Sequence, residues 1–343
     1  MSMWRPPTMP ETRERVREPA MWPVDVDAIA SARERIAPYV PPSPLRSYGV
    51  LDAEVGVGIR VMVKHENFNP TGSFKVRNAF SFMTALSQDE RRYGIVAATR
   101  GNHGLGLAYA GRTFDVPVTI CVPLGNNPEK NAGMRALGSR LIEEGRDYDE
   151  SLAVAERIVR DEGARLAHST NDARIIAGAG TMSLEMAEQD PTLDAIVISV
   201  GGGSQAVGAM AVMRALRPNV RVYGVQAAGA PATHDSWHAG VPQTTDRAVT
   251  IADGLATRST YELTFPALRE GLADFITVTE AEIASAIRLL LRTTHSLVEG
   301  AGATGMAGLL ALRERLAGQR VAVVISGGNI DAQTLRRVVT QEI

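Results

Sequence analysis

The amino-acid sequence predicts an α/β fold whose β-sheets are largely parallel and are covered by helices on both faces. Short apolar runs rich in β-branched residues alternate with helix-like stretches over most of the chain, and this alternation is typical of parallel sheets built from βαβ units. Glycine-bearing turns follow four of the expected strands. The 343 residues exceed the roughly 250–300 at which one hydrophobic core stops growing, so we expect two domains.

The first segment of the chain shows no periodic pattern of apolar residues, and the expected helices and strands follow it. Residues 1–24 are predicted to be a flexible N-terminal arm, and residues 27–36 a first helix that a proline-rich stretch ends. Strands are then expected at residues 60–63, 94–98, 118–122, 140–142, 194–200, 222–225, 275–278 and 320–325. Helices are expected at residues 73–86, 102–114, 129–137, 148–161, 174–188, 205–215, 280–291 and 302–316.

Composition and charge argue against several classes of protein. The chain is 45% hydrophobic and 22% charged with a formal net charge of −2, which argues against binding to nucleic acid or to a charged membrane surface. No apolar run approaches the roughly 20 residues of a transmembrane helix. The charged, proline-broken start does not have the pattern of a secretory signal. We therefore expect a cytoplasmic protein that binds neither nucleic acid nor membrane.

Cysteine and histidine give no pattern typical of a metal site. Cys121 is the only cysteine, which excludes an internal disulfide and a CxxC site. His234 and His238 lie four residues apart, but the glutamate of an HExxH motif and a third ligand are missing. We expect no metal centre, and interpret these histidines as packing or surface residues.

Lysine is rare in this chain, because Lys64, Lys75 and Lys130 are the only lysines among 36 basic residues. Lys75 lies in the sequence PTGSFKVRNAF at the start of an expected helix, where the helix dipole disfavours a cation. The dipole and partial burial both favour the neutral amine, which is the form that condenses with an aldehyde. A solvated surface lysine is the alternative, and the rarity of lysine argues against it.

The sequence GGGSQ at residues 201–205 follows an apolar strand and opens a helix. Free N–H groups and the helix dipole make such a turn suitable for binding an anion, especially a phosphate. The segment is not a GxGxxG motif, since Ala206 occupies the last glycine position, and it lacks the Gly-Lys-Ser/Thr of a Walker loop. A tight structural turn is the alternative interpretation.

Two further turns carry side chains suited to a binding cleft. In TRGNHG at residues 99–104, Asn102 could cap the next helix or present its amide to a ligand ring. His103 could act in acid–base chemistry or position a ligand. In SGGN at residues 326–329, Ser326 can place a hydroxyl in the floor of the cleft, since ligands bind at the carboxyl ends of strands in such folds.

Together these motifs resemble the fold-type II pyridoxal-phosphate (PLP) enzymes of the serine/threonine dehydratase group, which includes threonine ammonia-lyases and serine racemases. HENFNPTGSFKVRNA (65–79) is similar to the Schiff-base lysine motif, TRGNHG to the asparagine loop and GGGSQ to the phosphate loop. TIADGLA (250–256), VEGAGA (298–303) and SGGN (326–329) also match in order. The resemblance spans residues from about 25 to the end of the chain.

The resemblance implies a fold like that of the tryptophan synthase β subunit, with the cofactor in a cleft between two parallel-sheet domains. Residues 25–77 and 169–343 would form the large PLP-binding domain, and residues 78–168 a small mobile domain. Such enzymes act on small amino acids, and the resemblance also implies a homodimer.

The resemblance also implies a role for each residue of the site. Lys75 would hold PLP as a Schiff base and act as the catalytic base, and Phe74 would pack beside the ring. Asn102 would bond the ring hydroxyl, and Ser326 would face the ring nitrogen, where a neutral hydroxyl suits β-elimination. The cofactor phosphate would be bound by Gly201, Gly202, Gly203, Ser204 and Gln205. The substrate carboxylate would be bound by Thr99, Arg100, Gly101, Asn102 and His103.

The chain departs from the family pattern at several positions. Arg100 replaces a small serine that serves serine racemases as a second acid/base, so racemisation is disfavoured. Arg100 could instead bind a second carboxylate of the substrate, or form a salt bridge with the other domain. Gln226 and Ala232 stand where the metal-binding variants carry acids. The regulatory C-terminal domain of biosynthetic threonine dehydratases is not expected.

These observations predict a PLP-dependent ammonia-lyase that converts L-threonine or L-serine to a 2-keto acid and ammonia by β-elimination. One alternative is a dehydratase for an anionic or unusual hydroxy amino acid, such as 3-hydroxyaspartate or a hydroxyectoine-derived compound. A second is a PLP-dependent β-replacement synthase. Outside this class, the alternative is a non-catalytic Rossmann-like binding protein, and the missing nucleotide motifs argue against it.

Overall fold

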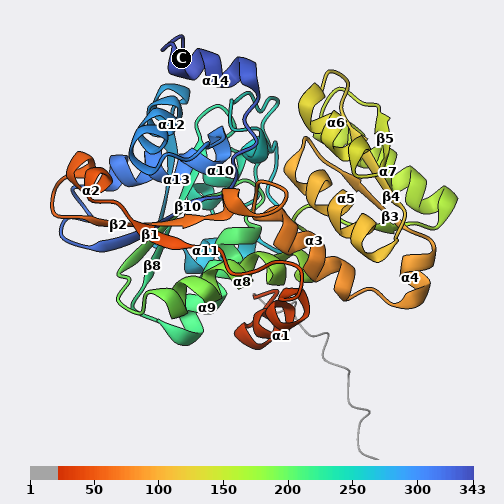
Figure 1. Ribbon diagram of the computed structural model, residues 1–343, viewed down its shortest axis with the longest axis horizontal. Helices are drawn as coiled ribbons and strands as arrows, with labels where there is room; N and C mark the ends of the chain where they lie inside the picture. The colour runs from red at the N-terminus through yellow and green to blue at the C-terminus, as the bar shows by residue number, and fades with distance from the viewer. Residues whose placement is uncertain (1–21) are drawn as a thin grey trace, which may run out of the picture.

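The computed structural model describes residues 22–343, which form two β-sheets surrounded by helices (Figure 1). The larger sheet has six strands in the order β1-β2-β10-β7-β8-β9, and all its neighbouring pairs are parallel except β1 and β2. The smaller sheet has four parallel strands in the order β5-β4-β3-β6. The prediction of an α/β fold with two largely parallel sheets is confirmed.

The strands have the following bounds in chain order: β1 Leu45–Ser47, β2 Arg60–His65, β3 Ile95–Ala98, β4 Val118–Val122, β5 Arg140–Glu143, β6 Arg165–Leu166, β7 Ala195–Ser199, β8 Arg221–Ala227, β9 Asp274–Val278 and β10 Arg320–Ile325. The helices are α1 Val26–Ile36, α2 Gly49–Val55, α3 Lys75–Thr84, α4 Gln88–Arg92, α5 Asn102–Phe114, α6 Pro128–Ala136, α7 Tyr148–Glu162, α8 Ala173–Gln189, α9 Ser204–Leu216, α10 Ala232–Ala239, α11 Phe265–Gly271, α12 Glu280–Thr294, α13 Gly300–Leu312 and α14 Ala332–Val339. Short 3₁₀ helices lie at Glu66–Phe68 (η1) and Asp253–Leu255 (η2).

The six-stranded sheet is buried on both faces, which explains why its strands are continuous apolar runs. Along β10, Val321 and Val323 pack with α12 and α13, while the intervening Ala322 and Val324 pack with α8 and α9. This alternation follows from the two-residue period of a strand. The four helices therefore cover the two faces of the sheet in pairs (Figure 1).

The four-stranded sheet has the same layered construction. Ile95 and Ala97 of β3 pack with α3, α5 and α6, whereas Val96 and Ala98 pack with α7. Helix α3 contacts both α5 and α8, so it lies between the two sheets and begins at Lys75.

A buried ion network fixes the start of α3. Arg77 donates to Glu66 at 2.7 Å and to Glu185 of α8 at 2.6 Å, and Lys64 of β2 donates to Glu185 at 2.6 Å. All four side chains are buried. Buried charges are tolerated only when they are paired and hydrogen-bonded, so this network holds the first turn of α3 in one position.

The predicted elements are all present in the described residues, with boundaries that shift by a few residues. Strands β1 and β6 and helices α2, α4, α10, α11 and α14 have no counterpart among the ranges expected from periodicity. Residues 1–21 of the predicted N-terminal arm lie outside the described residues. No helix between residues 22 and 343 combines the length and apolar character needed to cross a membrane.

Candidate active site

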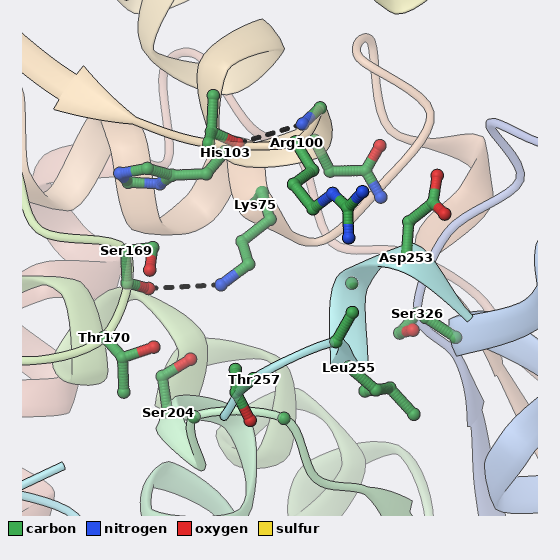
Figure 2. A pocket seen from close by; sticks show the side chains of 18 of the residues that line it. Lys75, Arg100, His103, Ser169, Thr170, Ser204, Asp253, Leu255, Thr257 and Ser326 are labelled. Carbon is green, nitrogen blue, oxygen red and sulfur yellow. Dashed lines mark hydrogen bonds between the residues drawn. The ribbon is translucent and has the colours of Figure 1, made fainter. Parts of the chain in front are cut away.

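A single cavity at the carboxyl ends of the strands is lined by every residue predicted for the site. Figure 2 shows part of this lining. The start of α3, the β3–α5 turn, the β7–α9 turn and the residue after β10 supply them. The parallel strands end at the same edge of each sheet, which explains why segments far apart in sequence meet here. The predicted residues at the cavity are Phe74, Lys75, Thr99, Arg100, Gly101, Asn102, His103, Gly201, Gly202, Gly203, Ser204, Gln205 and Ser326.

Lys75 is partly buried and extends into the cavity without a carboxylate partner in the described residues. Its Nζ atom donates to the backbone oxygen of Ser169 at 3.2 Å and lies 4.9 Å from the centroid of the Phe74 ring (Figure 2). Burial lowers the pKa of Lys75 to about 8, because desolvation penalises the charged form. A substantial fraction of this amine is therefore neutral near physiological pH.

The β7–α9 turn forms a cradle of backbone N–H groups. The N–H groups of residues 201–205 donate to no other residue in the described part of the chain, and they open the 13-residue helix α9. A Cβ atom at Gly202 would lie 2.4 Å from Oγ1 of Thr170, and Gly203 adopts a φ of +98°. The turn therefore requires glycine at these two positions and presents several free donors to an anion.

Asn102 is held from both sides by residues of other elements. Its Nδ2 donates to Oε1 of Glu299 at 2.5 Å, and its Oδ1 accepts from Nδ2 of Asn329 at 2.8 Å. Glu299 is buried, and this burial raises its pKa although the nearby ammonium of Lys130 opposes the shift. Lys130 lies 3.8 Å from Glu299 and 3.0 Å from Asp253.

His103 is neutral and donates from Nε2 to the backbone oxygen of Ala167 at 2.9 Å. Since a carbonyl can only accept, Nδ1 of His103 is the unprotonated nitrogen, and it has no hydrogen-bond partner among the described residues. Burial lowers the pKa of His103 to about 3. The geometry thus favours a positioning role over proton transfer at neutral pH.

Of the two interpretations of Arg100, the salt bridge with the other domain is not formed among residues 22–343. No carboxylate of the described residues lies within ion-pair distance of its guanidinium, which extends into the cavity on the side of Asp253 and Leu255 (Figure 2). This cation is therefore available to an anionic ligand.

Several other residues line the cavity without a role predicted from the sequence. Tyr148 and Ser169 form a hydroxyl pair at 3.1 Å, and burial raises the pKa of Tyr148. Glu299 lies in the segment 298–303 and Asp253 in the segment 250–256, and both residues line the cavity. Both segments resemble the family, but the resemblance did not predict which residues these two side chains contact. The further lining residues are Lys130, Thr170, Ser199, Gly254, Leu255, Ala256, Thr257, Tyr261 and Ala301.

The remaining histidines lie outside this site. His238 contacts the backbone oxygen of Phe275 at 2.9 Å, and His234 contacts Asp235 at 2.8 Å. Between residues 22 and 343 no three side chains of histidine, cysteine, aspartate or glutamate gather as a metal site would require.

Comparison with known proteins agrees with this site. Residues 36–327 match the family described as pyridoxal-phosphate dependent enzyme, so the chain belongs to this family and uses PLP. An L-threonine ammonia-lyase of Thermotoga maritima is 38% identical over 295 residues, which are 86% of this chain and 73% of that protein.

The similarity to two further proteins extends over nearly the whole length of each. An L-threo-3-hydroxyaspartate ammonia-lyase of a Pseudomonas species is 32% identical over 305 residues, which are 89% of this chain and 95% of that protein. The structure of maize serine racemase superposes with a TM-score of 0.87 at 30% identity, over 94% of this chain and 98% of that one. Among these relatives the chain is a fold-type II PLP enzyme, as the sequence predicted.

The residues at the cavity fit this cofactor. Five free N–H groups at the start of α9 suit its phosphate, and the desolvated amine of Lys75 suits its aldehyde. The amide of Asn102 and the hydroxyl of Ser326 line the same cavity and can bond polar atoms of a ring. The phosphate cradle and the amine come from different elements, so the fold brings together two groups that the cofactor requires.

Proposed function

We propose that this chain is an ammonia-lyase that acts on a β-hydroxy amino acid such as L-threonine or L-serine. The Cα proton and the β-hydroxyl leave as water, and hydrolysis of the resulting enamine takes up one water and releases a 2-keto acid and ammonia. The observation that carries the proposal is the desolvated amine of Lys75, whose pKa is lowered to about 8, beside an anion cradle in one cavity. The similarity to an L-threonine ammonia-lyase supports the same reaction.

The chain's own residues supply binding, orientation and a base. When bound, PLP condenses with the substrate amine and withdraws electrons from Cα, which acidifies its proton. The neutral amine of Lys75 takes this proton as general base. The free N–H groups of residues 102–104 at the start of α5 bind the substrate carboxylate. Phe74 packs beside the ring, residues 201–205 hold the phosphate, and Ser326 faces the ring nitrogen.

Lys75→Ala tests this assignment directly. The variant should release no 2-keto acid or ammonia from L-threonine and L-serine, and borohydride should no longer reduce PLP onto the protein. Assays for 2-keto acid and for ammonia measure the reaction. The absorbance of bound PLP and mass mapping of the borohydride-reduced protein measure attachment of the cofactor. Elimination activity that persists in Lys75→Ala would contradict the proposal. A wild-type protein that takes up no PLP would instead favour a non-catalytic binding protein.

The product assay also separates elimination from β-replacement. Release of 2-ketobutyrate from L-threonine without an added nucleophile supports an ammonia-lyase. A reaction that requires an added thiol or amine, with no keto acid formed, would indicate a β-replacement synthase.

A second candidate substrate carries an additional anionic group, such as the distal carboxylate of 3-hydroxyaspartate. The specific observation is the unpaired guanidinium of Arg100 in the cavity, among the described residues, which can bind a carboxylate in a bidentate manner. The similarity to an L-threo-3-hydroxyaspartate ammonia-lyase supports it. Arg100→Ser should lower kcat/KM for L-threo-3-hydroxyaspartate by roughly tenfold to a hundredfold, with a smaller effect on L-threonine. An equal effect on both substrates would count against the anion site.

The working state of the enzyme is a further part of the proposal. We propose that residues 78–168 form a mobile domain that closes over residues 25–77 and 169–343, and that the enzyme is a cytoplasmic homodimer. Support for closure comes from the cavity, whose lining is shared between the two parts of the chain. Light scattering after gel filtration measures the oligomeric state, and a monomeric holoenzyme would contradict the dimer.

A further inference from the structure

The amide of Asn102 is part of a row of polar side chains that joins the two parts of the molecule at the cavity. Asn329 and Glu299 belong to the part that carries the six-stranded sheet, whereas Asn102 begins α5 beside the four-stranded sheet. The row runs from the backbone oxygen of Thr71 through Asn329 and Asn102 to Glu299. Lys130 of α6 then lies between Glu299 and Asp253 and contacts both carboxylates.

The direction of each hydrogen bond in this row is fixed by its first member. The oxygen of Thr71 can only accept, so Nδ2 of Asn329 must be the donor at 2.9 Å. The same Nδ2 donates its second proton to Oδ1 of Asn102 at 2.8 Å. Asn102 therefore faces Asn329 with its oxygen and Glu299 with its NH₂ group, and the Glu299 oxygen accepts at 2.5 Å.

These contacts leave one hydrogen-bonding group of Asn102 unused. A primary amide has two N–H groups and one oxygen. The oxygen faces Asn329 and one N–H is bonded to Glu299, so the second N–H is the donor that remains for a ligand in the cavity. Reversal of the amide would point its oxygen at the Glu299 carboxylate and its NH₂ group at the NH₂ group of Asn329.

We propose that Asn329 and Glu299 are positioning residues that make Asn102 present an N–H, and not its oxygen, to the cofactor ring. The proposal rests on the proposed function, in which the ring lies beside Asn102. An N–H donor stabilises the ionised form of the ring oxygen over the protonated form. Lys130 supports this arrangement because its ammonium favours the ionised, accepting form of Glu299.

Asn329→Asp tests the proposal, because it preserves the shape of the side chain and reverses its hydrogen-bonding polarity. The carboxylate introduced at this position cannot donate to Thr71 or to Asn102, so the orientation of Asn102 is lost. We expect the dissociation constant for PLP to rise roughly tenfold, the value of about one hydrogen bond to a charged group. The absorption of the bound cofactor should shift toward the form with a protonated ring oxygen. PLP titration of the cofactor-free protein and its absorption spectrum measure both.

Asn67→Asp is the matched control. Asn67 also donates from its side chain to a backbone oxygen, that of Leu297, at 3.2 Å, and it lies beside the same 326–329 segment. Among the described residues, the side chain of Asn102 is hydrogen-bonded to Glu299 and Asn329 and not to Asn67. The control should keep the PLP affinity and the spectrum of the wild type.

The double variant Asn329→Asp with Glu299→Gln distinguishes positioning from structural support. The new carboxylate can accept from a reversed Asn102 amide, and the new glutamine amide can donate to the Asn102 oxygen, so the side-chain hydrogen bonds are restored with Asn102 turned around. The bond to Thr71 stays lost, so we expect the free energy of unfolding to recover only in part relative to Asn329→Asp, while PLP affinity and spectrum stay altered. Wild-type affinity and spectrum in the double variant would overturn the proposal. Failure of the wild type to form a reducible adduct at Lys75 would instead overturn the proposed function.

Discussion

The three lysines of this chain show how neighbouring residues decide the chemistry of one side-chain type. Lys64 and Lys130 are buried and Lys75 is partly buried, but Lys64 contacts Glu185 at 2.6 Å and Lys130 contacts Asp253 at 3.0 Å. Within the described residues, Lys75 has only the backbone oxygen of Ser169 and a nearby aromatic ring. Its ammonium is therefore desolvated without compensation, which lowers its pKa and makes it the reactive amine of the three.

The pH dependence of cofactor uptake should report this pKa. Only the neutral amine attacks an aldehyde, and Lys75 loses its proton near pH 8 instead of near 10.5. The rate of PLP uptake by cofactor-free protein should therefore rise with pH up to about 8 and then become constant. Stopped-flow absorbance between pH 7 and about 10 measures it, with Lys75→Ala as the control that forms no adduct. A rate that keeps rising toward pH 10 would show that Lys75 is solvated.

The sequence indicated which residues belong to the site, but not which side chains of the site contact one another. The rarity of lysine and the PTGSFK motif indicated Lys75, and the glycines at 201–203 indicated an anion site. The contacts of Asn102 with Glu299 and Asn329 join residues separated by 197 and 227 positions. No local pattern encodes such contacts, because they depend on how the two sheets are placed.

At the scale of elements, long periodic segments were predictable and short ones were not. Strands β4 and β10 and helix α5 have the predicted bounds. Helix α4 has five residues and no buried side chain, and its stability comes from the capping box of Ser87 and Glu90. Strand β6 has two residues, and β1 pairs antiparallel at the edge of its sheet with mostly exposed side chains. Neither gives a hydrophobic period that a sequence pattern could reveal.

The turn between β7 and α9 should not tolerate a methyl group at Gly202. A Cβ atom there would lie 2.4 Å from Oγ1 of Thr170 and 2.7 Å from Cε2 of Tyr261, so Gly202→Ala must displace the turn or these two side chains that line the cavity. We expect at least a roughly tenfold rise in the dissociation constant for PLP, because the N–H donors lose their common direction. PLP titration by fluorescence measures the change. Gly49→Ala is the control, since a Cβ atom at Gly49 meets nothing within 4 Å, and an equal loss in both variants would contradict the prediction.

At the scale of the whole molecule, the site depends on two separately packed sheets that share one cavity. The strands of the larger sheet are arranged in the order β1-β2-β10-β7-β8-β9, so β10, from the end of the chain, lies between β2 and β7. The order of the strands along the chain does not predict this arrangement. That insertion places Ser326 and Asn329 beside the start of α3 and the β3–α5 turn. Helix α3 contacts helices of both parts and so lies between the two sheets (Figure 1). Lys75 is the first residue of this helix.

Contacts between the two parts should also set substrate affinity. Arg258 donates from Nε to Asp149 of α7 at 2.8 Å, and its guanidinium lies 3.2 Å from Asp147. The ion pair of Arg258 and Asp149 is half-exposed. Such a pair stabilises the contact between the two parts by less than about 1 kcal/mol, and salt screens it. If residues 78–168 close over the substrate, Arg258→Ala should raise KM about threefold while kcat and the free energy of unfolding change little.

Arg140→Ala provides the comparison that isolates closure from general surface charge. Arg140 forms a similar exposed pair with Glu162 at 3.0 Å, but both residues belong to the part that carries the four-stranded sheet. Its loss should leave KM unchanged. Raising the salt concentration should increase the KM of the wild type toward that of Arg258→Ala, because screening weakens the same contact. Identical KM values and salt responses for the two variants would show that the Arg258 contact does not stabilise a closed state.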